Sequence, residues 1–160
     1  MYYCHMHSPV GKLLLAGDEN GLRILDFQDG PHPLRPGNGW QEDKQPFGQV
    51  MAQLAAYFAG RRRAFDVPLA PAGTPFQLKV WRALQTIPYG ETWSYGELAR
   101  RIRKPTASRA VGAANGDNPI AIIVPCHRVI GADGSLTGYG GGLRIKQQLL
   151  ELESGERSLF

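Results

Sequence analysis

A cysteine, a histidine and an arginine follow one another directly at the end of an apolar run. The run Ile120–Val124 leads into Pro125, and Cys126, His127 and Arg128 come next without a spacer. A buried strand that ends in unrelated polar residues is the simplest alternative, because cysteine is among the most buried residue types. The adjacent imidazole and guanidinium make an electropositive setting that favours thiolate. The proline also prevents ordinary ladder pairing at this point. We therefore predict that Cys126 is a nucleophile.

The basic charge of the chain comes from its second half. Residues 1–75 contain seven Lys or Arg and seven Asp or Glu, whereas residues 76–160 contain eleven and seven, which gives the net charge of +4. A basic half beside a neutral half favours an anionic partner, with nucleic acid as the first candidate. If the charge is considered alone, the simpler interpretation is that the small basic excess keeps the protein soluble.

The composition is that of an ordinary globular protein, with 42% hydrophobic and 20% charged residues. No stretch approaches the ~20 apolar residues of a membrane span, and the N-terminus lacks the pattern of a signal peptide. A soluble, cytoplasmic protein with reduced cysteines is therefore expected. One cysteine and three histidines precede the first helix: Cys4, His5, His7 and His32. They do not predict a metal site, because neighbours on a strand point to opposite faces and no Cys-x-x-Cys pair is present.

The first 70 residues predict a small strand-rich unit. Three strands are expected, over Tyr2–His7, Lys12–Ala16 and Leu22–Phe27. An Asn-Gly pair before the third strand is a strong hairpin signal. A helix is expected over Phe47–Ala59, where apolar residues recur at helical spacing. Residues 65–69 predict a further strand, and the proline among them would confine that strand to an edge of the sheet.

The second half predicts several short helices. Thr74 is expected to cap a helix whose first residue is Pro75. Ser94 and Glu97 form the capping-box pattern that opens another helix. A third helix is expected over Ala107–Asn115. Two short helices with a break of three or four residues match the helix-turn-helix pattern, which also occurs in proteins that bind no DNA.

The third of these helices is unusual because its side chains are small. Arg109 is its only long side chain, and Ala110, Ala113 and Ala114 lie around it. Major-groove readers carry several long polar residues, whereas a small-residue surface allows close backbone approach in the minor groove. An alanine-rich helix that packs tightly on a neighbour is the alternative, and Arg109 in its middle favours DNA binding.

The residues after Arg128 predict a hairpin, a loop and a helix. Val129–Ile130 and Ser135–Leu136 flank an Asp-Gly turn, and a hairpin after a helix-turn-helix would be a wing. Four glycines surround Tyr139 in residues 138–142, which we interpret as a pocket wall with free backbone N–H groups. A helix from Leu143 to Glu153 follows, with one apolar face.

Three motifs stand in a fixed order around the predicted nucleophile. They are Asn118-Pro119, Pro125-Cys126-His127-Arg128-Val129 and Gly138-Tyr139-x-Gly-Gly-Leu143. With Ser94-Tyr95 and residues 107–112 also in place, the chain resembles the O6-alkylguanine-DNA alkyltransferases, also called methylated-DNA–protein-cysteine methyltransferases. The resemblance covers roughly residues 76–153, and residues 1–70 match the family only in general layout.

The resemblance implies an α+β fold with two domains. A strand-rich α/β, ribonuclease H-like domain would span residues 1–70, followed by a linker over 71–75. A winged helix-turn-helix domain over 76–160 would bind DNA and accept the alkyl group. The resemblance also implies no cofactor, and double-stranded DNA containing O6-alkylguanine as the partner. O4-alkylthymine as a second substrate and cooperative binding of the monomer along DNA stay open.

The resemblance also assigns roles in the chemistry. Cys126 would accept the alkyl group, because displacement at carbon needs a soft, strong nucleophile. His127 would act as base through a water, because adjacent residues cannot easily face each other. Glu153 would orient the histidine, as in the relay of a hydrolase triad. Asn118 would hold the loop and the relay by hydrogen bonds. Arg128 is left without a role beyond structural hydrogen bonding.

A second set of residues would bind the base and the duplex. Tyr95 and the backbone N–H of Gly140 would stabilise the leaving guanine anion. The carbonyls of Cys126 and Val129 would accept from the guanine amino group. Arg109 would fill the stack vacated by the flipped base. The remaining predicted contacts are Ser94, Ala110, Ala113, Ala114 and Tyr139.

Two other functions are weighed against alkyl transfer. A sensor of alkylated DNA with the same fold would bind without reacting, but such relatives lack the acceptor cysteine that Cys126 supplies. A cysteine hydrolase would use Cys126 and His127, turn over repeatedly and need no DNA-binding helix. The order of motifs favours the alkyltransferase over both.

Overall fold

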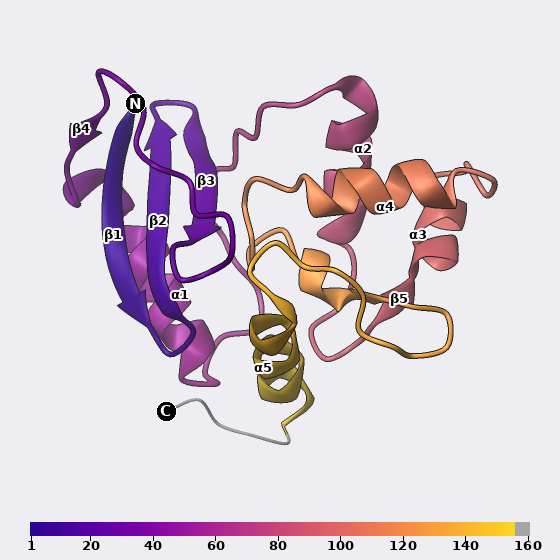
Figure 1. Ribbon diagram of the computed structural model, residues 1–160. Coiled ribbons are helices and arrows are strands. Elements are labelled where there is room, and N and C mark those ends of the chain that lie inside the picture. Colours follow the sequence, from indigo (N-terminus) through magenta and orange to yellow (C-terminus); the bar gives the residue numbers. More distant parts are fainter. Residues whose placement is uncertain (156–160) are drawn as a thin grey trace.

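The N-terminal region is built on one small sheet. The computed structural model describes residues 1–155. Its four-stranded sheet has the order β3-β2-β1-β4 and lies on the left in Figure 1. Antiparallel strands β1 (Tyr2–Ser8), β2 (Gly11–Asp18) and β3 (Gly21–Phe27) form its body. The short β4 (Gln41–Glu42) pairs parallel with β1.

The three predicted strands are confirmed, and the fourth prediction in this region is wrong. The predicted hairpin forms, but the pairing of Asp18 with Gly21 makes Glu19 and Asn20 its turn residues and leaves Gly21 as the first residue of β3. Residues 65–69 form no strand, and only a single bridge joins Leu69 to Leu22. The single proline in this segment, Pro68, has no backbone donor, and the pairing is limited to isolated hydrogen bonds around Leu22.

One helix covers the back of the sheet in the view of Figure 1. A 3₁₀ turn, η1 (Gln45–Phe47), leads into α1 (Gly48–Phe58). The buried residues of α1 recur at helical spacing and include Leu54 and Tyr57, so the predicted helix is confirmed. The helix ends before Gly60, whose φ of 75° suits glycine best.

Three helices form the opposite side of the molecule (Figure 1). They are α2 (Pro75–Leu84), α3 (Tyr95–Arg101) and α4 (Ser108–Gly116). Thr74 caps α2 as predicted, within a complete capping box. The Ser94 side chain accepts from the backbone N–H of Glu97, which is half of the predicted box. The Glu97 carboxylate is instead paired with two arginines of the same helix, so the reciprocal half of the prediction is wrong.

The segment that carries the predicted nucleophile is a turn rather than a strand. Residues 121–123 form a tight turn in which Ile122 has φ of 69°, a strained value for a β-branched residue. The 3₁₀ turn η2 (Cys126–Arg128) follows directly. The apolar run is nevertheless buried.

The predicted wing hairpin is wrong in its pairing. Strand β6 (Val129–Ile130) pairs parallel with β5 (Trp93–Ser94), and within residues 1–155 it forms no ladder with Ser135–Leu136. The turn closes instead through a hydrogen bond of 2.9 Å from Gly131 N to Ser135 O. The last helix, α5 (Leu143–Ser154), buries the predicted apolar face.

The two regions share one continuous hydrophobic core. Leu25 on β3 joins them through its backbone, donating to Pro119 O at 2.9 Å and accepting from Ala121 N at 3.1 Å. This junction fixes the start of the loop that leads to Cys126. Within residues 1–155, no helix is long and apolar enough to cross a membrane.

Candidate active site

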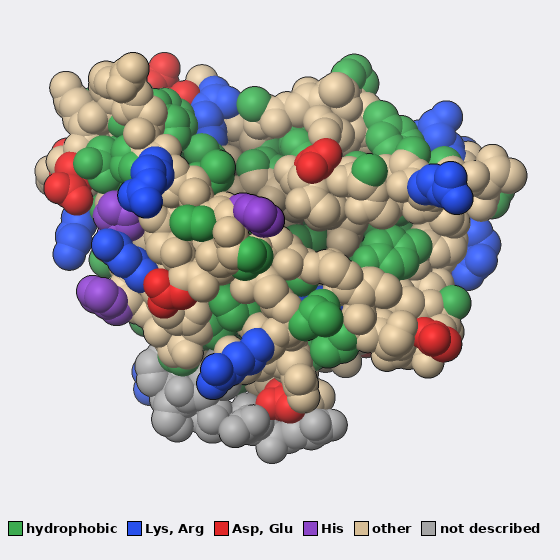
Figure 2. Space-filling model, in the orientation of Figure 1, with side chains coloured by type: hydrophobic (Ala, Val, Ile, Leu, Met, Phe, Trp, Pro, Cys, Tyr) green, Lys and Arg blue, Asp and Glu red, His purple; other side chains and the backbone are tan. Residues whose placement is uncertain are grey.

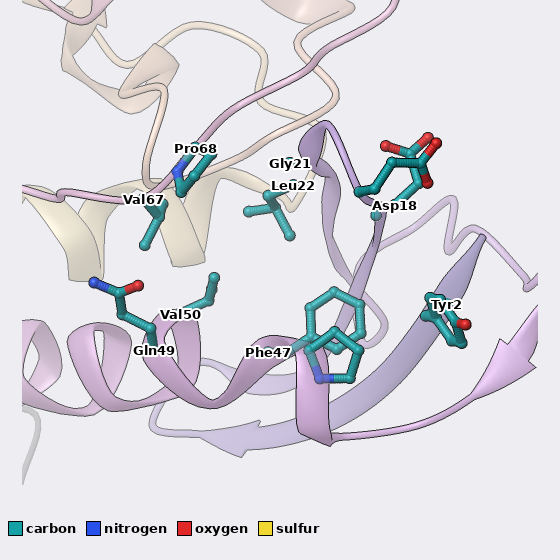
Figure 3. Close-up of a pocket in the computed structure, with 12 residues that line it drawn as sticks. Tyr2, Asp18, Gly21, Leu22, Phe47, Gln49, Val50, Val67 and Pro68 are labelled. Carbon is teal, nitrogen blue, oxygen red and sulfur yellow. The ribbon is translucent and has the colours of Figure 1, made fainter.

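Two cavities of similar size differ in what lines them. One of about 510 Å³ lies between the sheet and α1 in the N-terminal region, and Figure 3 shows its mainly apolar wall. Its only acidic side chains are Asp18 and Glu19, and Asp18 is already paired with Arg23 at 2.6 Å. The other cavity, of about 460 Å³, is lined by Cys126, Asn118 and the glycine-rich loop. We assign the site to the second cavity, because it contains a nucleophile and the first does not.

Asn118 organises the nucleophile loop. Its Nδ2 donates to Val124 O at 2.8 Å and to the Cys126 sulfur at 3.1 Å. Its Oδ1 accepts from Ile120 N at 3.0 Å. One side chain therefore joins both ends of the apolar turn to the thiol, which places Asn118 where the sequence predicts it.

The surroundings of Cys126 favour the neutral thiol over the thiolate. Burial raises the pKa of Cys126, although the hydrogen bond from Asn118 and the charge of Lys146 oppose that rise. Reaction as a nucleophile therefore requires removal of the proton as the substrate is attacked. The adjacent base matters more at this site than an electropositive surrounding does.

His127, Arg128 and Glu153 form a buried network beside the thiol. His127 Nε2 and Glu153 Oε2 are 2.7 Å apart. Arg128 donates to the same carboxylate from Nε at 2.7 Å and from Nη2 at 3.0 Å, and its Nη1 donates to Ile87 O at 2.7 Å. Arg128, for which the sequence gives no definite role, thus neutralises the buried carboxylate.

This network holds His127 as a neutral base. Burial lowers the pKa of His127, against the opposing effect of Glu153. Burial alone would raise the pKa of Glu153, but its interactions with His127 and with the positively charged Arg128 outweigh burial and lower that pKa to about 2. The ionised carboxylate accepts from Nε2–H, which leaves Nδ1 as the basic nitrogen. Nδ1 is buried and has no hydrogen-bond partner within residues 1–155.

Sequence reasoning missed Lys146, a fully buried lysine on α5. Its Nζ donates to Val129 O at 2.6 Å and to Thr137 O at 3.3 Å. Burial lowers the pKa of Lys146, and Cys126 opposes the shift. The signal was its spacing: Lys146, Leu149 and Glu153 repeat at three and four residues, which puts all three on the buried face of the helix.

The glycine-rich loop forms one wall of the cavity and is held by the N-terminal region. The ring centroids of Phe27 and Tyr139 are 5.7 Å apart. The Tyr139 hydroxyl is buried, and burial together with the neighbouring Cys126 raises its pKa well above the usual range. Gly141 lies so close to Phe27 that a Cβ there would be 2.5 Å from the ring.

The Gly141→Ala substitution is expected to destabilise the protein by about 1–3 kcal/mol, because the added methyl group must displace a packed ring. The free energy of unfolding in urea measures this effect. Gly138→Ala is the matched control in the same loop, since a Cβ at Gly138 meets no atom within 4 Å. Equal stability of the two variants would show that the loop does not pack on Phe27.

The small-residue helix presents its predicted surface, with one exception. Arg109, Ala110 and Ala113 are exposed, whereas Ala114 is buried and its carbonyl accepts from Trp81 Nε1 at 2.8 Å. The prediction that Ala114 contacts DNA is therefore wrong, because the residue faces α2. Figure 2 shows Lys and Arg side chains where α3 and α4 meet. The exposed basic residues of this segment are Arg100, Arg101, Arg103, Lys104 and Arg109.

Only two of the other predicted substrate residues outside α4 line the cavity. Among the described residues, Tyr139 and Gly140 line it, and Ser94 and Tyr95 do not. The Tyr95 hydroxyl is hydrogen-bonded to Thr137 Oγ1, at the start of the loop. The Val129 carbonyl already accepts from Lys146, and a carbonyl can accept a second hydrogen bond.

Two family models match the chain along nearly its whole length. The DNA binding domain of 6-O-methylguanine DNA methyltransferase matches residues 75–155. The ribonuclease-like domain of the same family matches residues 1–71.

Proteins similar to this chain carry the corresponding name. The methylated-DNA–protein-cysteine methyltransferase of Methanosarcina acetivorans is 58% identical over 153 residues, which cover 96% of this chain and 98% of that protein. Its namesake in Mycobacterium tuberculosis is 54% identical over 156 residues, covering 96% and 92%. The crystal structure of Mycobacterium tuberculosis OGT in complex with DNA has a TM-score of 0.91 at 54% identity, covering 97% of this chain and 94% of that one. The chain therefore belongs to the 6-O-methylguanine DNA methyltransferase family.

Proposed function

We propose that the protein repairs DNA by transferring the alkyl group of O6-alkylguanine to Cys126, once per molecule. The observation that carries this proposal is a buried thiol followed in the sequence by a buried histidine, whose Nε2 lies 2.7 Å from the carboxylate of Glu153. The family membership supports the substrate, and the relative crystallised with DNA supports the partner. The two cysteines are free and buried, which suits a protein of the reducing cytoplasm that works as a monomer.

The transfer is a single displacement in which His127 removes the thiol proton. The proton passes from Cys126 through a water to His127 Nδ1, which is the unpaired nitrogen. The S–C bond forms as the C–O6 bond breaks, and the electron pair of that bond stays on the guanine. Protonation of the guanine anion restores the normal base. A thioether is inert to hydrolysis, so the protein is consumed.

Donors around the cavity stabilise the charge that develops on the base. In this proposal the Tyr95 hydroxyl, turning from Thr137, and the backbone N–H of Gly140 donate to the leaving guanine. The carbonyls of Cys126 and Val129 accept from its amino group. An O4-alkylthymine has no such amino group, so guanine should be the better substrate at these acceptors.

Exposed small residues and one arginine suit entry of α4 into the minor groove. Ala110 and Ala113 permit close backbone approach, and exposed Arg109 fills the stack that the flipped base leaves. Ser94 caps α3, which holds that helix against α4 beside the backbone of the duplex. The other exposed basic residues of this segment add phosphate contacts without sequence preference; they are Arg100, Arg101, Arg103 and Lys104.

A titration of repaired DNA tests the proposed function. Protein is mixed with an excess of duplex DNA carrying O6-methylguanine in a restriction site, and restored cleavage counts the repaired bases. Repair should stop at one base for each protein molecule. Continued repair would indicate a turnover enzyme, and tight binding without repair would indicate a lesion sensor.

Arg109→Ala is expected to slow repair of duplex DNA by roughly tenfold or more, because unstacking a base costs a few kcal/mol that the arginine offsets. The reaction with the free base O6-benzylguanine should be unchanged. Arg103→Ala, an exposed arginine of the same patch, serves as the control for lost charge alone. An equal loss on the duplex and on the free base would exclude the base-flipping role.

A further inference from the structure

Tyr57 brings the N-terminal region into direct contact with the buried network. Its hydroxyl donates to Glu153 Oε2 at 2.6 Å, although the two residues are 96 positions apart. The same oxygen lies 2.7 Å from His127 Nε2. Tyr57 belongs to α1, behind the sheet, and Glu153 to α5, which lies between the sheet and β5 in Figure 1. A side chain from outside the DNA-binding region therefore reaches the group that orients the base.

The Tyr57 ring is fixed by its neighbours. It has no exposed surface. The ring centroids of Phe58, Phe65 and Tyr89 lie 5.3, 5.5 and 6.3 Å from that of Tyr57. Such edge-to-face and tilted contacts hold an aromatic side chain in one orientation. The hydroxyl is thus positioned before any substrate arrives.

The Tyr57 hydroxyl completes the set of donors around the carboxylate. Arg128 donates to both oxygens of Glu153, and His127 and Tyr57 donate to Oε2. Three of these four contacts are made to Oε2 and one to Oε1, so the oxygen that faces His127 is the most heavily hydrogen-bonded. Burial and the charge of Glu153 raise the pKa of Tyr57 well above its usual range, so the hydroxyl stays a donor at every working pH.

We propose that Tyr57 is a positioning residue for alkyl transfer, acting on His127 through Glu153. Its hydrogen bond withdraws negative charge from Oε2, which limits how strongly the carboxylate stabilises a protonated histidine. It also fixes the oxygen to which His127 Nε2 donates, and so the direction of Nδ1. This inference rests on the proposed function, because it assigns Tyr57 a part in that reaction.

A purely structural role makes a different prediction. A tyrosine that only satisfies the packing of the two regions would affect the stability of the fold and leave the base unchanged. A positioning residue changes the rate constant on the folded molecules and the pH at which the base becomes protonated. The single-turnover rate constant and its pH profile therefore separate the two roles.

The test is the Tyr57→Phe variant, which keeps the ring and removes one oxygen atom. Methyl transfer from duplex DNA with O6-methylguanine is followed by intact mass under single-turnover conditions between pH 4.5 and 9. We expect the rate constant at neutral pH to fall roughly tenfold. The lost hydrogen bond to a charged group fixes the position of Oε2, and without it Nδ1 of His127 is no longer held in one direction. The acid limb of the profile should move to higher pH, because His127 gains basicity when Oε2 loses a donor. DNA affinity should stay at the wild-type value.

Tyr89→Phe is the matched control, since it removes a hydroxyl from the same aromatic cluster. The Tyr89 hydroxyl donates to Leu152 O at 3.4 Å, and in the described part of the chain it is not among the hydrogen-bond donors to Glu153, which are Tyr57, His127 and Arg128. That variant should keep the wild-type rate constant and acid limb. Partial unfolding of Tyr57→Phe would lower only the amplitude of the reaction, because the rate constant reports on folded molecules.

Each outcome bears on one proposal alone. A slower Tyr57→Phe with a shifted acid limb, beside an unaffected Tyr89→Phe, supports the positioning role. A wild-type rate constant and acid limb in Tyr57→Phe, whatever its amplitude, would overturn that role while leaving alkyl transfer intact. No methyl group on the wild-type protein would instead overturn the proposed function.

Discussion

Replacing His127 with glutamine is expected to slow alkyl transfer at neutral pH on the order of 10²–10⁴-fold, the usual contribution of a general base. Burial holds the pKa of Cys126 above its ordinary value, so very little thiolate exists at pH 7 without a base. Glutamine can still donate a hydrogen bond to Glu153, which keeps the buried carboxylate partnered. The variant therefore removes the basic nitrogen and leaves most of the network.

The pH dependence gives this prediction a second, independent readout. His127 has a lowered pKa and is active when neutral, so the wild-type rate should be flat near pH 7 and fall only below pH 6.5. In His127→Gln the rate should rise about tenfold for each pH unit, because the thiol must ionise unaided. His7→Gln, an exposed histidine on β1, is the control. A flat profile in His127→Gln would mean that another group removes the proton.

Replacing Arg128 with methionine is expected to destabilise the fold by about 3–5 kcal/mol, because it leaves a buried carboxylate without its compensating charge. Arg128 is 6% exposed, and it donates twice to Glu153 and once to Ile87 O. His127 is neutral and cannot replace the lost charge. A loss of this size is a large fraction of the 5–15 kcal/mol typical of a whole domain.

Urea unfolding of Arg128→Met and Arg100→Met measures this difference directly. Arg100 also pairs with a glutamate, Glu97, at 2.8 Å, but its side chain is 62% exposed. Exposed ion pairs contribute about 0–1 kcal/mol, so Arg100→Met should unfold nearly as the wild type does. A similarly small effect at Arg128 would contradict the view that its charge stabilises the buried network.

The sequence predicts elements well where local signals decide them. The three strands of the sheet follow from short apolar runs bounded by turn residues, and the start of α2 follows from Thr74 and Pro75. The prediction of a wing hairpin was wrong because Val129–Ile130 pair with Trp93–Ser94, which lie far away in the sequence. The prediction that Ala114 contacts DNA was wrong because the pattern of small residues does not show which side of α4 packs on Trp81.

The parts of the site that escape sequence reasoning are those made by long-range contacts. Cys126 and His127 adjoin in the sequence, so their chemistry can be inferred from residue types alone. Tyr57 lies in a region without a chemical motif, and only the fold brings this residue of α1 to Glu153 on α5, 96 positions away. Lys146 resembles any surface lysine until the fold buries it.

The identity of the acceptor is the central claim, and mass mapping tests it most directly. The protein is incubated with duplex DNA carrying a single O6-methylguanine, and the intact protein and its peptides are weighed. One methyl group should appear, on the peptide containing Cys126, in the wild type and in Cys4→Ala, but not in Cys126→Ala. Cys4 is the matched control, because burial raises its pKa to about 11 and it lies outside the cavity. A methyl group on any other residue, or repair by Cys126→Ala, would contradict the account.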